Sequence, residues 1–115
     1  MIFEIGRWKV KKENSEKHQK AMQASVDFQK KNRERFTFTK SQFYSVLSED
    51  PDEETWIYID EYPDQATYQK WHDESYLIEI EMNEILKNWE ATIIRESFTL
   101  EVAVSNDDLC VKNIK

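Results

Sequence analysis

Apolar positions in the first third of the chain predict a strand followed by a helix. Residues 1–11 carry β-prone apolar side chains on both faces, as in a strand that is covered on both sides: Ile2, Phe3, Ile5, Trp8 and Val10. Asn14 or Ser15 then offers a helix N-cap, and the sequence favours helix, without glycine or proline, to about Arg35. One face of this helix is half apolar and is expected to point inward with His18 on it.

Two short apolar runs in the middle of the chain predict a β-hairpin. Residues 42–48 and 55–62 are rich in aromatic and β-branched side chains, and an acidic turn around Pro51 separates them. Because the two runs are close in sequence, antiparallel pairing is favoured. Large apolar side chains fall on both faces of this hairpin: Phe43, Tyr44, Val46, Leu47, Trp56, Ile57, Tyr58 and Ile59.

The segment that follows is predicted to be helical in two pieces. Pro63 fits the first turn of a helix and Asp64 can cap one, so a short helix is expected over residues 65–74. A second, more apolar helical run covers residues 77–89. Ser75 is expected to mark a break or kink between the two pieces.

The clearest strand is predicted over residues 91–104, where apolar side chains recur with period two. Typical strands have about 5–6 residues, so one of this length is expected to bend, to bulge or to pair with another subunit. Residues 105–115 read as a polar tail with one apolar patch, which comprises Leu109, Cys110, Val111 and Ile114.

This order of elements, βαββαβ, predicts an α+β fold with a ferredoxin-like layout over residues 1–104. Right-handed crossovers give a four-stranded antiparallel sheet with the helices on one face. The other face would then meet water although it too carries large apolar side chains. Apolar burial is worth about 25 cal/mol per Å², so a second copy of the chain is expected to cover that face as a two-fold homodimer.

The charge of the chain excludes several classes of function. Its 115 residues include 16 basic and 23 acidic ones, for a formal net charge of −7, and no basic stretch is available to neutralise nucleic-acid phosphates or anionic lipids. No apolar run approaches the roughly 20 residues of a membrane span, and residues 1–12 lack a signal-peptide pattern. A single cysteine cannot form an internal disulfide, so a cytoplasmic protein is expected.

The glycine and histidine content narrows the chemistry further. The chain has one glycine, Gly6, so its sequence contains neither a P-loop motif nor a glycine-rich dinucleotide-binding motif. Its two histidines are far apart and give no metal-ligand spacing. The carboxylates Glu79, Glu81 and Glu84 are expected to form a solvated helix face. Neither a metal nor an organic cofactor is therefore expected.

One stretch of the chain resembles a known superfamily. In residues 60–75 an aromatic residue ends a strand, an acidic turn follows, and a helix carries an ordered set of residues: Ala66, Tyr68, Trp71 and Ser75. This pattern, with the element order over residues 1–104, resembles the dimeric α/β-barrel superfamily and, within it, the antibiotic-biosynthesis monooxygenases. The resemblance implies a homodimer whose two sheets form a barrel, with a pocket between sheet and helices in each subunit. It also implies a small aromatic ligand, which some relatives oxidise without metal or organic cofactor.

Haem-degrading members of the superfamily offer a narrower comparison. They use an asparagine on the first strand, a tryptophan on the helix after the third strand, and a histidine further along. Trp71 matches the tryptophan, but the histidine position falls at Glu81 and the asparagine region offers Gly6 and Arg7. Because two of the three positions differ, haem degradation is not expected.

Four aromatic residues are candidates to line the pocket. Trp71 can stack on a planar ligand, because its ring offers a large rigid contact area; the alternative is that it anchors its helix to the sheet. Trp56, Tyr58 and Tyr62 alternate along the third strand on one face. They can line a cavity with phenol groups as hydrogen-bond donors, or they can form the core.

Three charged or titratable residues complete the candidates. His18 can act as a general base near neutral pH or play a structural part, and it joins Tyr58 and Trp71 as a candidate for catalysis. Arg95 interrupts the last strand and is expected to pair with an acid such as Glu61 or Glu101, or to bind an anionic ligand. His72 is expected to meet solvent.

These residues leave three functions open. An enzyme resembling cofactor-independent monooxygenases requires a cavity of roughly 300 Å³ or more on which Trp, Tyr or His groups converge. A non-catalytic ligand-binding protein requires the cavity without a group placed for proton transfer. A purely structural homodimer requires a core that is packed solid.

Overall fold

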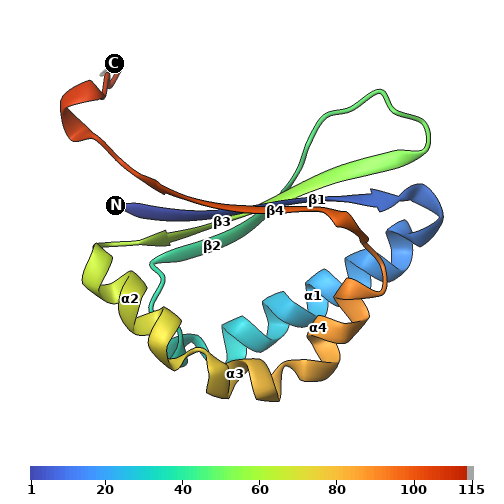
Figure 1. The fold of residues 1–115 in the computed structure, drawn as a ribbon, viewed down its shortest axis with the longest axis horizontal. Coiled ribbons are helices and arrows are strands. Elements are labelled where there is room, and N and C mark those ends of the chain that lie inside the picture. The colour runs from blue at the N-terminus through green and yellow to red at the C-terminus, as the bar shows by residue number, and fades with distance from the viewer. Residues whose placement is uncertain (114–115) are drawn as a thin grey trace.

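The helices lie on one face of a single antiparallel sheet, so the chain has an α+β fold (Figure 1). The structure is a computed structural model and describes residues 1–113. Its elements in chain order are β1 (Ile2–Lys11), α1 (Ser15–Lys31), β2 (Lys40–Ser45), β3 (Glu53–Tyr62), α2 (Gln65–Glu74), α3 (Tyr76–Glu81), α4 (Asn83–Glu90) and β4 (Ile94–Val104). Three short 3₁₀ turns accompany them: Lys12–Asn14, Arg33–Arg35 and Asp107–Leu109.

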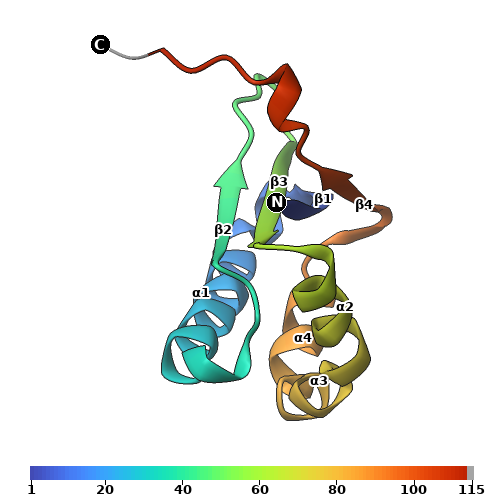
Figure 2. The ribbon, with the colours of Figure 1, turned by 90° about the vertical axis from the view of Figure 1, so that its left-hand side faces the viewer.

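The four strands are arranged in the order β2-β3-β1-β4, with every neighbouring pair antiparallel. β1 and β3 are therefore the central strands, and the predicted four-stranded antiparallel sheet is confirmed. The helices all lie beneath the sheet in Figure 2, with α1 at the left and α2, α3 and α4 together at the right. The space between the sheet and these two groups of helices is where the candidate site lies.

The helices largely follow the sequence pattern. The break at Ser75 is confirmed, since this residue separates α2 from α3, and Met82 divides the second run again into α3 and α4. The expectation that the first helix reaches Arg35 was wrong. Asn32 leaves helical dihedral angles, and its side-chain amide donates to the Phe28 carbonyl oxygen at 2.9 Å, so the helix ends at Lys31.

β2 and β3 each begin two residues before the expected position, and two other strand boundaries fall short of it. β2 ends at Ser45 instead of residue 48, and Leu47 is fully exposed in the connection to β3, not on a sheet face. β4 begins at Ile94 instead of residue 91, because the Thr92 hydroxyl donates to the Trp89 carbonyl oxygen at 2.7 Å and closes α4. The expected irregularity in this long strand is present as one register shift in its pairing with β1.

The pairing register sorts side chains onto the two faces of the sheet. Residues directly opposite each other on paired strands point to the same face. Three such pairs from β1 and β3 point toward the helices: Glu4 with Asp60, Gly6 with Tyr58, and Trp8 with Trp56. This face thus combines large aromatic rings with two carboxylates.

The helix-facing side holds two apolar clusters. One is centred on Trp8, Val10 and Met22, and it packs α1 against the sheet. The other is centred on Phe36 and joins α3 to the turn after α1. These clusters enclose the two ends of the space beneath the sheet.

No α-helix of residues 1–113 covers the opposite face of the sheet (Figure 1). Ile5 lies opposite Ile59, and Ile57 lies opposite Tyr44, so these four side chains form an apolar patch there, beside Arg7 and Gln42. The connection between β2 and β3 and the segment after β4 both extend on this side (Figure 1). Leu109 and Val111 of that segment are exposed, while Ile114 of the predicted apolar patch lies outside the described residues. Within residues 1–113, no helix is long and apolar enough to cross a membrane.

Candidate functional site

A pocket of about 270 Å³ lies between the sheet and the helices. Most of its wall is apolar, and the aromatic part comprises Trp8, Phe36, Phe43, Tyr58, Trp71, Trp89 and Phe98. Aliphatic and thioether side chains of the helices complete the apolar wall: Ala21, Met22, Ile78, Met82, Ile85 and Leu86. A mostly apolar pocket with a few convergent polar groups is the usual form of a small-molecule site.

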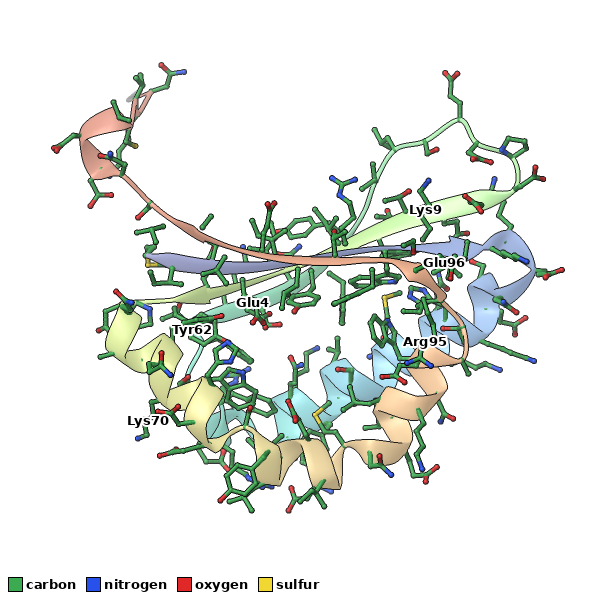
Figure 3. The ribbon with its side chains drawn as sticks, viewed as in Figure 1. Glu4, Lys9, Tyr62, Lys70, Arg95 and Glu96 are labelled. Carbon is green, nitrogen blue, oxygen red and sulfur yellow. The ribbon has the colours of Figure 1, made fainter. Side chains whose placement is uncertain are left out.

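The polar end of the pocket is built around Glu4 of β1, which is only 8% exposed. The Tyr58 hydroxyl donates to Glu4 Oε2 at 3.1 Å, and the Tyr68 hydroxyl lies 3.4 Å from Glu4 Oε1. His72 Nε2 lies 3.5 Å from the same Oε1 atom and also contacts the Tyr68 hydroxyl. Figure 3 shows the Glu4 side chain beneath the sheet, directed toward the helices. The Glu4 carboxylate is thus held by groups from two elements, β3 and α2.

Asp60 of β3 is the second carboxylate at this end. Burial raises its pKa from 3.8 to about 6; the negative charge of Glu4 adds to the rise and a hydrogen bond from the Ser41 side chain opposes it. Its Oδ1 atom is buried and has no hydrogen-bond partner among the described residues. Asp60 therefore offers an unoccupied acceptor on a residue that lines the pocket.

Tyr58 owes its position to the only glycine of the chain. A Cβ atom at Gly6 would lie 2.2 Å from Tyr58 Cε1 and 2.7 Å from Cδ1, so any other residue would displace the ring. The ring instead lies against the bare backbone of β1 and reaches Glu4. Burial and the nearby carboxylates of Glu4 and Asp60 raise the pKa of the Tyr58 phenol, so it stays a hydrogen-bond donor at neutral pH.

Behind the aromatic wall, Trp8 is tied to α1 through His18. Both side chains are fully buried, and Trp8 Nε1 donates to His18 Nε2 at 2.9 Å. Because Nε2 accepts, the neutral ring carries its proton on Nδ1, which has no partner among the described residues. Burial lowers the pKa of His18 from 6.5 to about 4, although the charge of Glu54 acts in the opposite direction. His18 is therefore a neutral support for a pocket wall.

The structure brings only part of the predicted site together. Tyr58 and Trp71 both line the pocket, whereas Trp56 and Tyr62 are absent from its wall. Trp56 instead donates to Glu54 Oε2 at 3.1 Å, and its ring lies 5.5 Å from that of His18.

Trp71 fits both of the roles that were expected for it. Its ring lies against Phe36, with ring centroids 5.2 Å apart, and so anchors α2 to the second apolar cluster. The same side chain lines the 270 Å³ pocket and a second pocket of about 260 Å³ on the side of Arg35. It can therefore hold its helix in place and touch a ligand at once.

Arg95 pairs with an acid, as expected, but with neither of the two acids that were expected. Arg95 is exposed and lies 3.8 Å from Glu90, not beside Glu61 or Glu101, because the chain turns directly from α4 into β4. Its side chain is not part of the pocket wall. His72 meets solvent, as expected, with its side chain 44% exposed, and Nε2 of its ring also lies 3.5 Å from Glu4 Oε1.

Comparison with known proteins adds no assignment. No protein-family model, curated protein or solved structure matches this chain. Within residues 1–113, no group of three or more His, Cys, Asp or Glu residues is placed to hold a metal ion. The function must therefore be argued from the pocket itself, which can accept hydrogen bonds and take up a proton at Asp60.

Sequence reasoning missed the two residues that define the polar end. Glu4 falls in phase with Trp8 on the first strand, and Asp60 falls in phase with Tyr58 on the third. An acidic residue that falls on the same strand face as buried aromatic residues can be recognised in the sequence, because a buried polar group needs a partner. What the sequence lacked was the register that places these two acids opposite each other.

Proposed function

We propose that this chain binds a small, largely apolar ring compound in the pocket and holds it through a hydrogen-bond donor. The observation that carries the proposal is the buried Oδ1 atom of Asp60, which lacks a partner at the end of an aromatic pocket. An unsatisfied buried acceptor is costly, and a ligand donor would remove that cost. Aromatic walls supply the apolar contact for the rest of the molecule.

The size of the pocket supports a ligand of one or two rings. Pockets for small molecules have volumes of about 300–1,000 Å³, and the 270 Å³ of this pocket lies just below that range. The rings of Trp8 and Trp89 meet edge to face with centroids 5.2 Å apart, which gives a rigid wall at one end. Phe43 and Phe98 flank Trp8, so planar ligands fit this end best.

A ferredoxin-like subunit of a dimeric α/β barrel is the architecture that we propose for this pocket. The strand order β2-β3-β1-β4 and the βαββαβ order of elements support it. The helix-free sheet face supports the homodimer, because its apolar patch of Ile5, Tyr44, Ile57 and Ile59 would be covered by the same face of a second copy. Each subunit would keep its own pocket on the helix side.

A second candidate function is catalysis that resembles the cofactor-independent monooxygenases. One observation favours it: burial raises the pKa of Asp60 to about 6, which suits a general base at neutral pH. The carboxylate would take the proton of a phenolic hydroxyl and leave an electron-rich phenolate, for which dioxygen is the oxidant. Trp71 and Tyr58 would hold the ring, with the Tyr58 hydroxyl as a donor.

Quenching of tryptophan fluorescence tests ligand binding directly, because Trp8, Trp71 and Trp89 all line the pocket. A panel of one-ring and two-ring phenols, alcohols and amines is titrated into the full chain. Saturable quenching that weakens in Asp60→Asn, but not in the exposed control Asp107→Asn, supports the proposal. If no compound of the panel quenches saturably, the binding function is refuted.

Dioxygen uptake with a panel of quinols separates catalysis from binding. The enzyme hypothesis expects uptake above the spontaneous rate, and a loss of that excess in Asp60→Asn. Saturable binding of the quinols with no uptake above the spontaneous rate would leave a binding protein and reject the catalytic alternative.

A further inference from the structure

We propose that the pocket is selective for organic cations, namely a protonated amine carried on a ring-sized apolar body. This inference rests on the proposed binding function and specifies the ligand class. It follows from the charge of the pocket, from the chemistry of its walls and from the acceptors that the protein leaves unused.

The charge of the pocket wall has one sign. Three carboxylates line it, those of Glu4, Asp60 and Glu79, and no lysine or arginine of residues 1–113 does so. Burying a carboxylate without a counter-charge is expensive, and proteins normally pair such groups. An anionic ligand would add to this repulsion, whereas a cation would relieve it.

The carboxylates of Glu4 and Asp60 differ in the hydrogen-bond donors that the protein supplies to them. Glu4 accepts from the hydroxyls of Tyr58 and Tyr68 and has His72 at 3.5 Å. Asp60 forms no ion pair among the described residues, and its Oδ1 atom has no donor at all. The missing partner is thus a donor that also carries positive charge, at the Asp60 side of the pocket.

The acceptors at the polar end of the pocket suit an ammonium group. A primary ammonium has three N–H donors, whereas a hydroxyl has one. Asp60 and Glu4 stand opposite each other on paired strands, and both line the pocket. Two neighbouring carboxylates suit a donor group with several hydrogens.

The aromatic walls supply the remaining part of the recognition. A cation within about 6 Å of the face of Trp, Tyr or Phe is attracted by the ring quadrupole, and tryptophan is the strongest of the three. Trp8, Trp71 and Trp89 all belong to the wall, and Tyr58 stands between them and the carboxylates. An apolar body would pack against these rings while its ammonium group meets Asp60.

The test compares three probes of similar shape and different charge on the full-length chain. These are 2-phenylethylamine, 2-phenylethanol and 3-phenylpropanoate, each titrated at about pH 8 with tryptophan fluorescence and calorimetry as readouts. We expect the amine to bind at least about tenfold more tightly than the alcohol, because only the amine brings the counter-charge. The carboxylate probe should not bind measurably.

Variants assign the effect to the proposed residues. Asp60→Asn should weaken amine binding by about tenfold and change alcohol binding by less than about threefold, and Asp107→Asn should change neither. Glu4→Gln serves as a second variant if Asp60→Asn fails to fold by circular dichroism, with the same loss expected for the amine alone.

Three results would overturn the inference. Equal affinities for the amine and the alcohol would show that the pocket recognises a hydrogen-bond donor and not a positive charge. That result would refute the selectivity for cations and leave the proposed binding function intact. Tight binding of the carboxylate probe would contradict the argument from the negative charge of the pocket wall. Amine binding that neither Asp60→Asn nor Glu4→Gln weakens would place the cation elsewhere.

Discussion

Neutralising Asp60 should stabilise the folded chain at neutral pH. Burial raises the pKa of this carboxyl from 3.8 to about 6, so the folded state holds the proton more tightly than the unfolded state does. A difference of one pKa unit equals about 1.4 kcal/mol, which makes the full penalty for the ionised group about 3 kcal/mol. Asp60→Asn keeps the shape of the side chain, retains an acceptor for Ser41 and removes the charge.

The pH dependence gives the sign of this effect. Between pH 3.8 and about pH 6 the folded state binds more protons than the unfolded state at this site, so its contribution to stability falls as pH rises. Above about pH 6 the whole penalty is present; below about pH 4 it is absent. The stabilisation by Asp60→Asn should therefore be about 1–3 kcal/mol at pH 8 and close to zero at pH 4.

Urea denaturation at several pH values measures this difference, at one fixed chain concentration because a dimer would unfold in a concentration-dependent way. The exposed variant Asp107→Asn is the matched control, for which a change within about 0.5 kcal/mol is expected at every pH. A destabilised Asp60→Asn at pH 8, or an equal gain at pH 4 and pH 8, would refute the reasoning.

Three further predictions concern the rest of the structure. Gly6→Ala should cost about 1–3 kcal/mol in urea denaturation because its Cβ meets the Tyr58 ring, and much less in a Tyr58→Ala background; equal costs in both would contradict the close contact. Nitrogen NMR should show His18 neutral with its proton on Nδ1 until about pH 4, and titration near 6.5 would contradict its burial. Light scattering at micromolar concentration should give twice the 13.9 kDa chain mass, and Ile59→Lys should halve it; a wild-type chain of 13.9 kDa would remove the dimer.

The fold was predictable because most of its signals are local. The strands and the helices between them followed from periodicity, from the cap at Asp64 and from the break at Ser75, and both residues lie at helix boundaries as expected. The boundaries that failed depended on single side chains that bond back to the preceding turn, namely Asn32 and Thr92. Such bonds are available at many positions, and sequence alone does not show which of them form.

The candidate site was predictable only for residues whose position depends on one element. Tyr58 and Trp71 stand on the inward faces of a strand and a helix, so their place in the pocket followed from periodicity. Glu4 and Asp60 depend on the pairing of two strands that are distant in sequence, and a one-residue slip would move either acid to the other face. The partner of Arg95 was not predictable for a similar reason, because its pairing with Glu90 depends on the tight connection between α4 and β4.

The absence of a side chain at Gly6 controls the shape of the pocket through its contact with Tyr58. Gly6 does not line the pocket, yet it fixes how deep the Tyr58 phenol can settle and thus how much room remains beside the carboxylates. A substitution at this one backbone position would displace the Tyr58 ring and so change the polar end of the pocket without replacing any residue of its wall. Redesign of the pocket should therefore start at residue 6, beneath the ring.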